Sequence, residues 1–482
     1  MIKINLKEYL KLSVIYTALA AFPPILQVIV RPIIEGSDRL KAEEFSRLSI
    51  VEFIITLSFT LVIFAMNNAI ARFHYDYSND KVKHKRMVSS IFTSMLMRGV
   101  IIMGVALIIG PFIGPIFTQY ELKDFTTYGY AAVLTGINRG IVLTAAALYR
   151  NQKKVWLFVI AMFSWGILRT TFQLLGLFYV EMNFIGYVNG NCVGSIIVAV
   201  AVLFYIFKKN GIVWDRQMLK PIRAFAWPLF QYSVIYWAII FIDRLFLADR
   251  PIELGIYDTA VTFAFGIQMI LQGIQGASQP EIYRLMSEGI KKNIDKIKQY
   301  SNIMMLQTEF IIALLIIPAM LYLNLFFETE LMFASQLIGI IFIKFIMRSQ
   351  IVIFSYPIYF LKKTEAFLYI NSAVLIITIL ANYFLVPIFG VYGAIIAGLL
   401  AFFLQALLTY FYQQKLVKIK WNLRKVMYFP LLMVFSAIAL EVTKFVYRLD
   451  QYMISGILIG IIFLFIFLMY KQEIKRYIPF KS

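Results

Sequence analysis

Long apolar runs recur along the whole chain, separated by short polar connections. We count fourteen runs of about 20 mainly apolar residues, near residues 10–34, 48–71, 87–118, 125–149, 155–180, 184–207, 224–248, 252–278, 300–327, 331–361, 367–388, 391–413, 426–447 and 452–470. As a helix, such a run crosses the roughly 30 Å hydrocarbon core of a bilayer. The pattern predicts an all-α polytopic membrane protein with about 14 transmembrane helices. Because the first run stays apolar to Ile34, we expect an uncleaved helix there and not a signal peptide.

Lys and Arg are concentrated in every second connection. Residues 81–86, 208–223 and 415–425 are basic, whereas residues 181–183 and 328–330 are short and poor in cations. Cytoplasmic loops of membrane proteins are enriched in Lys and Arg. The alternation therefore predicts a multi-pass protein with both termini in the cytoplasm. It also accounts for the net charge of +20, so we expect no nucleic-acid partner.

The composition agrees with a membrane protein and narrows its chemistry. The chain is 61% hydrophobic and 15% charged, whereas soluble proteins are about 45–50% apolar and about 25% charged. Cys192 is the single cysteine, so an internal disulfide is excluded, and His74 and His84 are the two histidines. We expect no metal centre and no cofactor.

Short segments in the two halves of the chain resemble each other. LYRNQKK (148–154) closes the fourth run and IYFLKK (358–363) closes the tenth, while GY (186–187) opens the sixth and YG (392–393) opens the twelfth. The separation of about 207–210 residues indicates that runs 1–6 and 7–12 are two copies of one six-helix unit. Two copies with an even number of helices share one orientation and are related by a pseudo-twofold axis along the membrane normal. We predict three domains, a six-helix lobe at 1–210, a second at 211–414 and a two-helix appendage at 415–482.

Five cations lie within the apolar runs: Arg98, Arg139, Arg169, Lys344 and Arg348. The first four lie 11 to 14 residues from the predicted helix starts, which is roughly 16–21 Å and near the middle of the membrane. Arg348 lies one turn from Lys344 on the same helix face. A lone charge at the centre of a membrane helix costs roughly 2.5–3.5 kcal/mol. Each cation therefore needs water, a partner or a ligand.

Two interpretations account for these charges. Either each cation pairs with a buried acid, for which Glu52, Asp243, Asp258 and Glu309 are available, or the cations line a water-filled cavity and bind an anionic ligand. Arg244, a sixth cation that follows Asp243 directly, is expected to pair. We expect Glu309 alone among the four acids to lie deep in the membrane, so too few acids remain, and a water-filled cavity between the two lobes is favoured for at least three of the other five cations.

Glu309 itself has two open roles. It lies about nine residues into the ninth run and is the one deep carboxylate that the sequence offers. In one role it is a candidate coupling residue that binds a proton or a sodium ion during transport. In the other it pairs with a neighbouring cation and only holds helices together.

Five segments, in order along nearly the whole chain, resemble one family. They are NAIARF (68–73), KPIRAFAWPL (220–229), IDRLFLA followed by LGIY (242–248 and 254–257), QPEIYR (279–284) and NYFLVPIFGVYGA (382–394). The sequence resembles the polysaccharide-transport flippases of the multidrug/oligosaccharidyl-lipid/polysaccharide exporter superfamily. The family's own motif residues belong to the scaffold, so the resemblance implies structural roles for Asp243, Arg244, Gly255 and Tyr257.

The resemblance implies a function and a mechanism. Such flippases move an undecaprenyl-pyrophosphate-linked oligosaccharide repeat unit from the cytoplasmic to the outer leaflet of the bacterial inner membrane. They serve the biosynthesis of O-antigen and lipopolysaccharide, capsule or exopolysaccharide. The expected mechanism is alternating access through a V-shaped cavity. The expected partners are the lipid-linked oligosaccharide, membrane lipids, and a proton or sodium ion.

Other functions remain open at this point. A multidrug extruder of the same superfamily is disfavoured because many extruders carry a carboxylate in the first helix of a lobe, and residues 10–34 contain neither Asp nor Glu. A lipid II flippase also remains open, because its fold and its arrangement of buried cations would look the same in the sequence. A membrane-bound polymerase or ligase is not expected, because the longest outer connection, residues 31–47, is short and the cytoplasmic loops lack a paired-carboxylate site.

Overall fold

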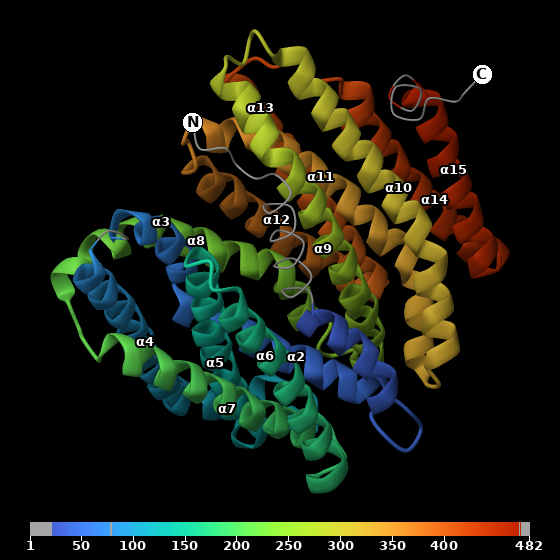
Figure 1. Cartoon of the computed structure of the whole chain (residues 1–482). Helices are drawn as coiled ribbons and strands as arrows, with labels where there is room; N and C mark the ends of the chain where they lie inside the picture. Colours follow the sequence, from blue (N-terminus) through green and yellow to red (C-terminus); the bar gives the residue numbers. More distant parts are fainter. Residues whose placement is uncertain (1–21, 78–79, 472, 474–482) are drawn as a thin grey trace. The chain divides into compact units, whose positions relative to one another are not determined.

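The computed structural model describes residues 22–77, 80–471 and 473, and helices make up the regular structure of this part (Figure 1). One isolated bridge joins Glu35 and Leu40. Within the described residues, 13 helices are long and apolar enough to cross a membrane, and a shorter apolar helix spans Phe22–Ile34. The all-α polytopic fold is therefore confirmed. The start of the first predicted run, residues 10–21, lies outside the described residues, and with it the part that decides between an uncleaved helix and a signal peptide.

The packing divides the chain into two units, Met1–Gly255 and Ile256–Ser482, here called unit 1 and unit 2. Unit 1 contains α2 (Ala42–Ile63), α3 (Met66–Tyr77), α4 (Lys81–Ile113), α5 (Phe125–Asn151), α6 (Val155–Leu175), α7 (Phe184–Asn210), α8 (Arg216–Phe246) and the start of α9 (Pro251–Ser287). The predicted division at residues 1–210, 211–414 and 415–482 follows the sequence repeat instead of the packing, and it stays a prediction.

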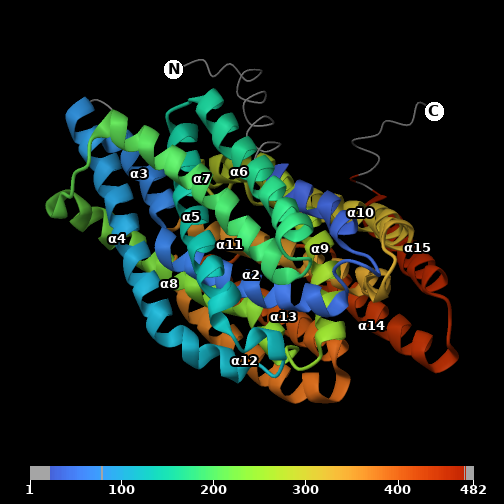
Figure 2. The same cartoon turned by 90° about the horizontal axis from the view of Figure 1, so that it is seen from below.

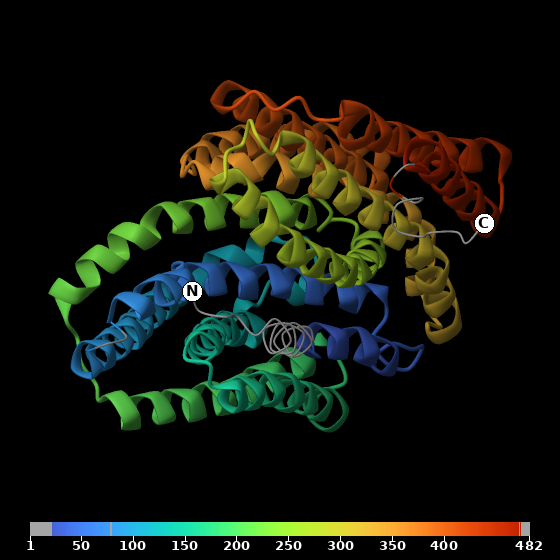
Figure 3. The same cartoon turned by 45° about the horizontal axis from the view of Figure 1, so that its top comes forward.

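Unit 2 contains the rest of α9 and six further α-helices. They are α10 (Ile294–Phe326), α11 (Ile338–Phe360), α12 (Ala366–Phe389), α13 (Val391–Leu416), α14 (Phe429–Tyr447) and α15 (Gln451–Met469). The 3-10 turns of residues 330–337 lead into α11, and a π-helical turn at residues 424–428 leads into α14. Helices α14 and α15 pack against each other, and α15 also packs along α10 (Figure 3).

The connections of unit 1 meet at two opposite ends. At one end, Gln119 Nε2 donates to Ser46 Oγ at 3.1 Å and to the Ala248 carbonyl at 2.9 Å, which joins the α4–α5 and α8–α9 connections to the start of α2. At the other end, Ser89 Oγ of α4 donates to the Gly211 carbonyl at 2.7 Å and accepts from the Val213 N–H at 2.7 Å. Alternate connections therefore gather at alternate ends, as the charge pattern predicts. We call the end with the α3–α4, α5–α6 and α7–α8 connections the basic end.

The same helix packing occurs in both units. Unit 1 has the packed pairs α4–α5, α5–α7 and α6–α7, and unit 2 has α10–α11, α11–α13 and α12–α13. Each pair recurs six helices later in the chain. This recurrence supports the predicted repeat, with α5 equivalent to α11.

The repeat extends to the turns that end α5 and α11. Lys153 has φ +56° and Lys362 has φ +58°. The N–H of the next lysine, Lys154 or Lys363, donates to the carbonyl five residues earlier, at 2.9 and 3.0 Å respectively. This is the Schellman turn, whose left-handed position glycine usually occupies. Both copies place a lysine there.

Helices α5 and α11 are also the most buried of the 13 candidate spans. In each helix, 78% of an apolar 18-residue segment is buried. Helix α5 packs on α2, α4, α6 and α7 (Figure 2). The equivalent central helices of the two units thus carry three of the five predicted cations, Arg139, Lys344 and Arg348.

Candidate functional site

Arg139 of α5 pairs with Glu52 of α2. Its Nη1 lies 2.8 Å from Glu52 Oε1, and its guanidinium lies 5.2 Å from the centroid of the Phe59 ring. The expectation that Glu52 lies too near the outer surface to pair was wrong. Helix α2 begins at Ala42 and not near residue 48, so Glu52 lies about 15 Å along the helix.

Arg169 of α6 lies close to this ion pair. Glu52 and Arg139 are both within electrostatic range of its guanidinium, which lies 5.6 Å from the centroid of the Trp165 ring. Helix α7 passes closely here, because a Cβ on Gly194 would lie 2.8 Å from the Arg169 Cα. Glu52, Arg139 and Arg169 form what we call the unit 1 cation cluster. Two cations and one carboxylate give it a net charge of +1.

A network of neutral polar groups adjoins Arg169. Gln27 Nε2 donates to Thr170 Oγ1 at 3.3 Å and to Gln173 Oε1 at 3.1 Å, while the Tyr187 hydroxyl donates to Gln27 Oε1 at 3.0 Å. Sequence reasoning missed Gln27 and Tyr187. The signal for Gln27 was its position as an amide inside an otherwise apolar run.

Arg98 lies elsewhere in unit 1, at a break between α2 and α3. Phe64 and Ala65, with φ +47° and +54°, interrupt the helix. Arg98 Nε donates to the Val62 carbonyl at 3.1 Å, and the guanidinium lies 5.1 Å from the centroid of the Phe64 ring. Val62 is ten residues beyond Glu52, or about 15 Å along α2. Arg98 is therefore not part of the unit 1 cation cluster, and its substrate-binding role stays a prediction.

The Arg98 side chain also has unused hydrogen-bonding capacity. Its Nη1 donates to Ser94 Oγ at 3.3 Å, while Nη2 is buried and has no hydrogen-bond partner among the described residues. A helix end leaves carbonyls without intrahelical donors. The contact with Val62 means that Arg98 satisfies one of these carbonyls inside the membrane-spanning region.

Lys344 and Arg348 lie on the one accessible stripe of α11. Between residues 338 and 358, every residue is buried except Lys344, Arg348 and Val352, which follow each other at four-residue spacing. The Lys344 ammonium lies 5.0 Å from the centroid of the Phe402 ring on α13. A Cβ on Gly398 would lie 3.0 Å from Lys344 Nζ, so the glycine makes room for the ammonium group.

Glu309 of α10 is completely buried. Its Oε1 accepts a hydrogen bond from the Tyr470 hydroxyl at 3.4 Å, and Oε2 has no hydrogen-bond partner among the described residues. Nearby, Lys425 pairs with Glu473. Glu309 lies about 26 Å along α10 from Phe326, level with the start of α14 and the end of α15. These contacts tie the last two helices to α10, and neither proposed role of Glu309 is decided by them.

The four scaffold residues lie in tight contacts. Arg244 Nη1 lies 3.2 Å from Asp243 Oδ1 and 3.2 Å from the Ile240 carbonyl oxygen, and its side chain is 2% exposed. The structure thus contains the pair expected from the sequence. A Cβ on Gly255 would lie 2.0 Å from the Ala42 carbonyl oxygen, so glycine allows α9 to approach the start of α2. Tyr257 is 2% exposed. The structural role of these residues remains an implication of the resemblance.

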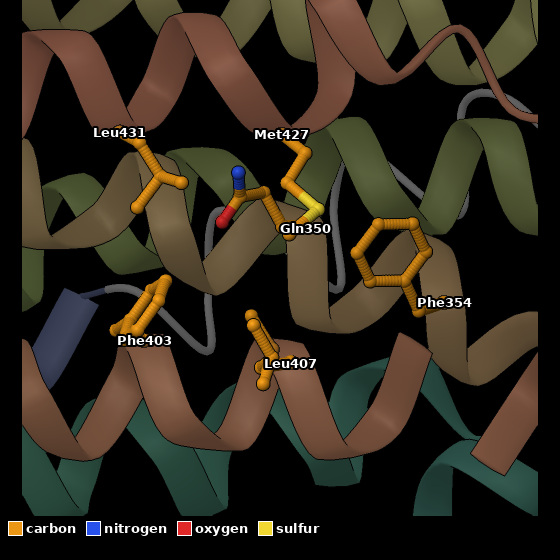
Figure 4. Close-up of a pocket in the computed structure, with 7 residues that line it drawn as sticks. Gln350, Phe354, Phe403, Leu407, Met427 and Leu431 are labelled. Atoms are coloured by element: carbon orange, nitrogen blue, oxygen red, sulfur yellow. The ribbon is translucent and has the colours of Figure 1, made fainter. Parts of the chain in front are cut away.

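A small pocket in unit 2 lies between α11, α13 and α14 (Figure 4). Gln350 is its polar residue, and Gln350 Nε2 donates to the Val426 carbonyl at 2.6 Å. The labelled lining residues are Gln350, Phe354, Phe403, Leu407, Met427 and Leu431. The lining contains none of the five predicted cations. Its apolar character suits helix packing and does not suit a charged ligand.

The fold of this chain is similar to that of solved flippases and transporters. The lipid II flippase MurJ, in an inward closed conformation, is similar with a TM-score of 0.71 and 13% identity, covering 96% of this chain and 100% of MurJ. An inward-facing multidrug resistance MATE transporter of the MOP superfamily is similar with a TM-score of 0.66 and 13% identity, and the match covers 84% of this chain and 97% of that transporter. A Pyrococcus furiosus MOP superfamily transporter with reverse polarity of its binding pocket is similar with a TM-score of 0.59 and 14% identity, and the match covers 84% of this chain and 95% of that transporter.

The chain belongs to the polysaccharide biosynthesis protein family. The family's sequence profile matches residues 10–286, more than half of the 482 residues. No curated protein matches the sequence. The family resemblance that the five sequence segments indicated is therefore confirmed, and the solved structures support the fold.

Proposed function

We propose that this protein is a flippase for an undecaprenyl-pyrophosphate-linked oligosaccharide repeat unit. It moves this lipid from the cytoplasmic to the outer leaflet of the bacterial inner membrane by alternating access, and it supplies the synthesis of O-antigen and lipopolysaccharide or of exopolysaccharide. In the proposed orientation the basic end of unit 1 and both termini face the cytoplasm. The protein has no catalytic role.

The observation that carries this proposal is the placement of cations on the two equivalent central helices. Helices α5 and α11 are the most buried candidate spans, yet they contain Arg139, Lys344 and Arg348. A charged side chain inside a membrane is energetically costly, and such residues commonly line a substrate pathway. Paired cations bind phosphate oxygens through strong charge-assisted hydrogen bonds. Lys344 and Arg348, one turn apart on one stripe, suit the two phosphates of a pyrophosphate.

The unit 1 cation cluster supports the same substrate chemistry. Arg139 forms an ion pair with Glu52, while Arg169 lies over the Trp165 ring and adds a second positive charge. The cluster therefore keeps a net positive charge next to the neutral network of Gln27 and Tyr187. Amides and hydroxyls of this kind bind sugar hydroxyl groups through hydrogen bonds. We propose that unit 1 contributes Arg139 and Arg169 to substrate binding, and that Arg98 adds a third cation.

Thermal unfolding of the purified protein tests the substrate class. The test ligands are an undecaprenyl-pyrophosphate disaccharide, the neutral alcohol undecaprenol, lipid II and the cationic dye rhodamine 6G. A ligand that binds the folded protein raises its unfolding temperature with concentration. We expect the pyrophosphate disaccharide to raise it and undecaprenol to have no effect. Stabilisation by rhodamine 6G alone would contradict the proposal.

A lipid II flippase is the second candidate. The similarity to MurJ covers 96% of this chain, and lipid II is also a polyprenyl pyrophosphate that carries sugars. The same unfolding series separates the two candidates, because a lipid II flippase would be stabilised by lipid II and not by a pyrophosphate disaccharide of another glycan. A multidrug extruder suits the cation-bearing α5 and α11 poorly, since cationic drugs are repelled there.

A further inference from the structure

The two histidines of the chain meet at the basic end of unit 1. His74 of α3 and His84 of α4 face each other, with His74 Nδ1 2.9 Å from His84 Nε2 and the rings nearly perpendicular at 80°. One of these nitrogens donates and the other accepts. The contact therefore fixes both rings beside the Lys-rich connections.

Two lysines approach the histidine pair from other elements. Lys154, in the α5–α6 connection, lies within electrostatic range of both imidazoles, and Lys209, near the end of α7, lies within range of His84. Lys154 and Lys209 also lie close to each other. Four side chains that carry or accept protons thus converge from four parts of unit 1. We call them the basic-end site.

The Schellman turn at the end of α5 holds Lys154 in this position. Lys153 adopts the left-handed conformation, and Lys154 Nζ donates to Gln152 Oε1 at 2.7 Å. A non-glycine residue in that conformation is strained. Burial, and then the neighbouring Lys209, lower the pKa of Lys154 to about 8. The fold therefore keeps two like charges together where free lysines would move apart.

No carboxylate of the described residues forms an ion pair with Lys154 or Lys209. Two acids at this end, Asp76 and Asp80, pair with Arg72 and Lys83 close to them in sequence. Convergent cations without an acid favour an anion from outside the protein. Phosphate oxygens accept hydrogen bonds from ammonium groups and from the N–H of a neutral imidazole.

We propose that His74, His84, Lys154 and Lys209 form a binding site for a phosphate oxyanion at the basic end of unit 1. Two sources share this chemistry: the pyrophosphate of the lipid-linked substrate, met before it enters the transporter, and the head group of an anionic phospholipid. The site itself does not depend on transport. Only the assignment of lipid pyrophosphate as its ligand rests on the proposed function.

The repeat supplies a matched control. Lys363 follows the same left-handed turn at the end of α11, but it is exposed, and Tyr283 and Asn293 stand 209 residues after His74 and His84. A Lys363→Gln variant therefore removes an equivalent lysine without changing the basic-end site. A combined Lys154→Gln and Lys209→Gln variant removes both ammonium groups of the site.

The histidines allow a site-specific measurement, because they are the only two in the 482 residues. Full-length protein with isotope-labelled histidine, in phosphatidylcholine nanodiscs at pH 7, is titrated with inorganic pyrophosphate while the imidazole NMR signals are recorded. We expect saturable shifts in the wild type and in K363Q, and at least about tenfold weaker binding in the double lysine variant. Binding should also weaken as the salt concentration rises.

Lipid additions then identify the source of the oxyanion. Shifts produced by undecaprenyl pyrophosphate, and not by phosphatidylglycerol, assign the site to the substrate, whereas the reverse result assigns it to a membrane phospholipid. Imidazole signals that do not move with any of these phosphates overturn the proposal, and so do equal shifts in the double lysine variant and the wild type. Shifts in a protein that fails to transport would keep the site and reject the proposed function.

Discussion

Arg139 and Glu52 join the central helix of unit 1 to α2, with 2.8 Å between Nη1 and Oε1. Their side chains are 29% and 41% exposed, so the pair is accessible. Arg169 lies within range of both partners and carries a second positive charge. Glu52 therefore adjusts the charge of the unit 1 cation cluster without neutralising it.

Substitutions of the two partners should have opposite effects on anion binding. Glu52→Gln raises the net charge of the cluster from +1 to +2, whereas Arg139→Gln lowers it to zero. We expect the first variant to bind undecaprenyl pyrophosphate more tightly and the second to bind it less tightly, each by about three- to tenfold. Titration calorimetry in nanodiscs measures this. Weaker binding in both variants would show that the pair acts only as a structural contact.

Arg98 should contribute to stability through the break between α2 and α3. Arg98→Gln removes the donor to the Val62 carbonyl, and leaving a buried acceptor unpaired costs about 1–3 kcal/mol. The single cysteine, Cys192, is buried, so a thiol-reactive dye reports unfolding directly. We expect a lower unfolding temperature for Arg98→Gln and an unchanged one for the control Met97→Ala, because Met97 is exposed on the same helix. Equal unfolding temperatures for Arg98→Gln and the wild type would remove this role.

Glu309→Gln and Tyr470→Phe separate coupling from structural support. Both variants change the hydrogen bond between these residues, but only the first removes the carboxylate. If Glu309 binds the coupling ion, Glu309→Gln should lose the dependence of transport on a proton or sodium gradient, and Tyr470→Phe should keep it. Transport in proteoliposomes with imposed gradients measures this. Loss of stability in both variants, with gradient dependence retained, would make Glu309 a purely structural residue.

The basic-end site should lose affinity for anions as the pH rises through about 8. Lys154 has a pKa of about 8, below the ordinary lysine value of 10.5, and its protonated form attracts a phosphate. The other titratable groups that face it are His74, His84 and Lys209. We expect pyrophosphate affinity to fall between pH 7 and 9 in the wild type, with a smaller fall in Lys154→Gln. Identical pH profiles would contradict the assignment of this titration to Lys154.

The lowered pKa of Lys154 also makes the stability of the folded protein depend on pH. The unfolded chain, with its ordinary lysine, binds more protons than the folded chain between pH 8 and 10.5. Stability contributed by this group therefore increases with pH across that window and is constant below it. This effect has the opposite direction to the loss of anion binding.

The sequence predicted the helical class, the alternation of the connections and the repeat because each depends on local periodicity and charge. The equivalent turns at Lys153 and Lys362 even preserve the lysines by which the repeat was found. Partners across helices were harder to predict. The second predicted run, residues 48–71, starts six residues after the true start of α2 at Ala42, because Ala42 to Arg47 are polar enough to resemble a loop. The depth of Glu52 in the membrane was therefore predicted wrongly.

The break at Phe64 and Ala65 carried no sequence signal, because neither residue is a glycine or a proline. The contacts of Gln27 with Thr170 and Tyr187 join residues more than 140 positions apart in the chain. Such contacts follow from the packing of the first helix on α6 and α7 and not from any local pattern. Hydrophobic periodicity therefore predicts which residues enter the membrane, but not which of them meet.

Lipid flipping by the purified protein tests the central claim most directly. Proteoliposomes carry a fluorescent undecaprenyl-pyrophosphate disaccharide, and a membrane-impermeant reductant bleaches the molecules in the exposed leaflet. An interior-negative potential should accelerate outward movement of the anionic lipid, by about 2.3 kcal/mol per charge per 100 mV. We expect transfer between leaflets with the wild type and with the control Lys363→Gln, and none with the double variant Lys344→Gln and Arg348→Gln at normal protein level. Wild-type protein without transfer, or a double variant with wild-type transfer, would contradict the account.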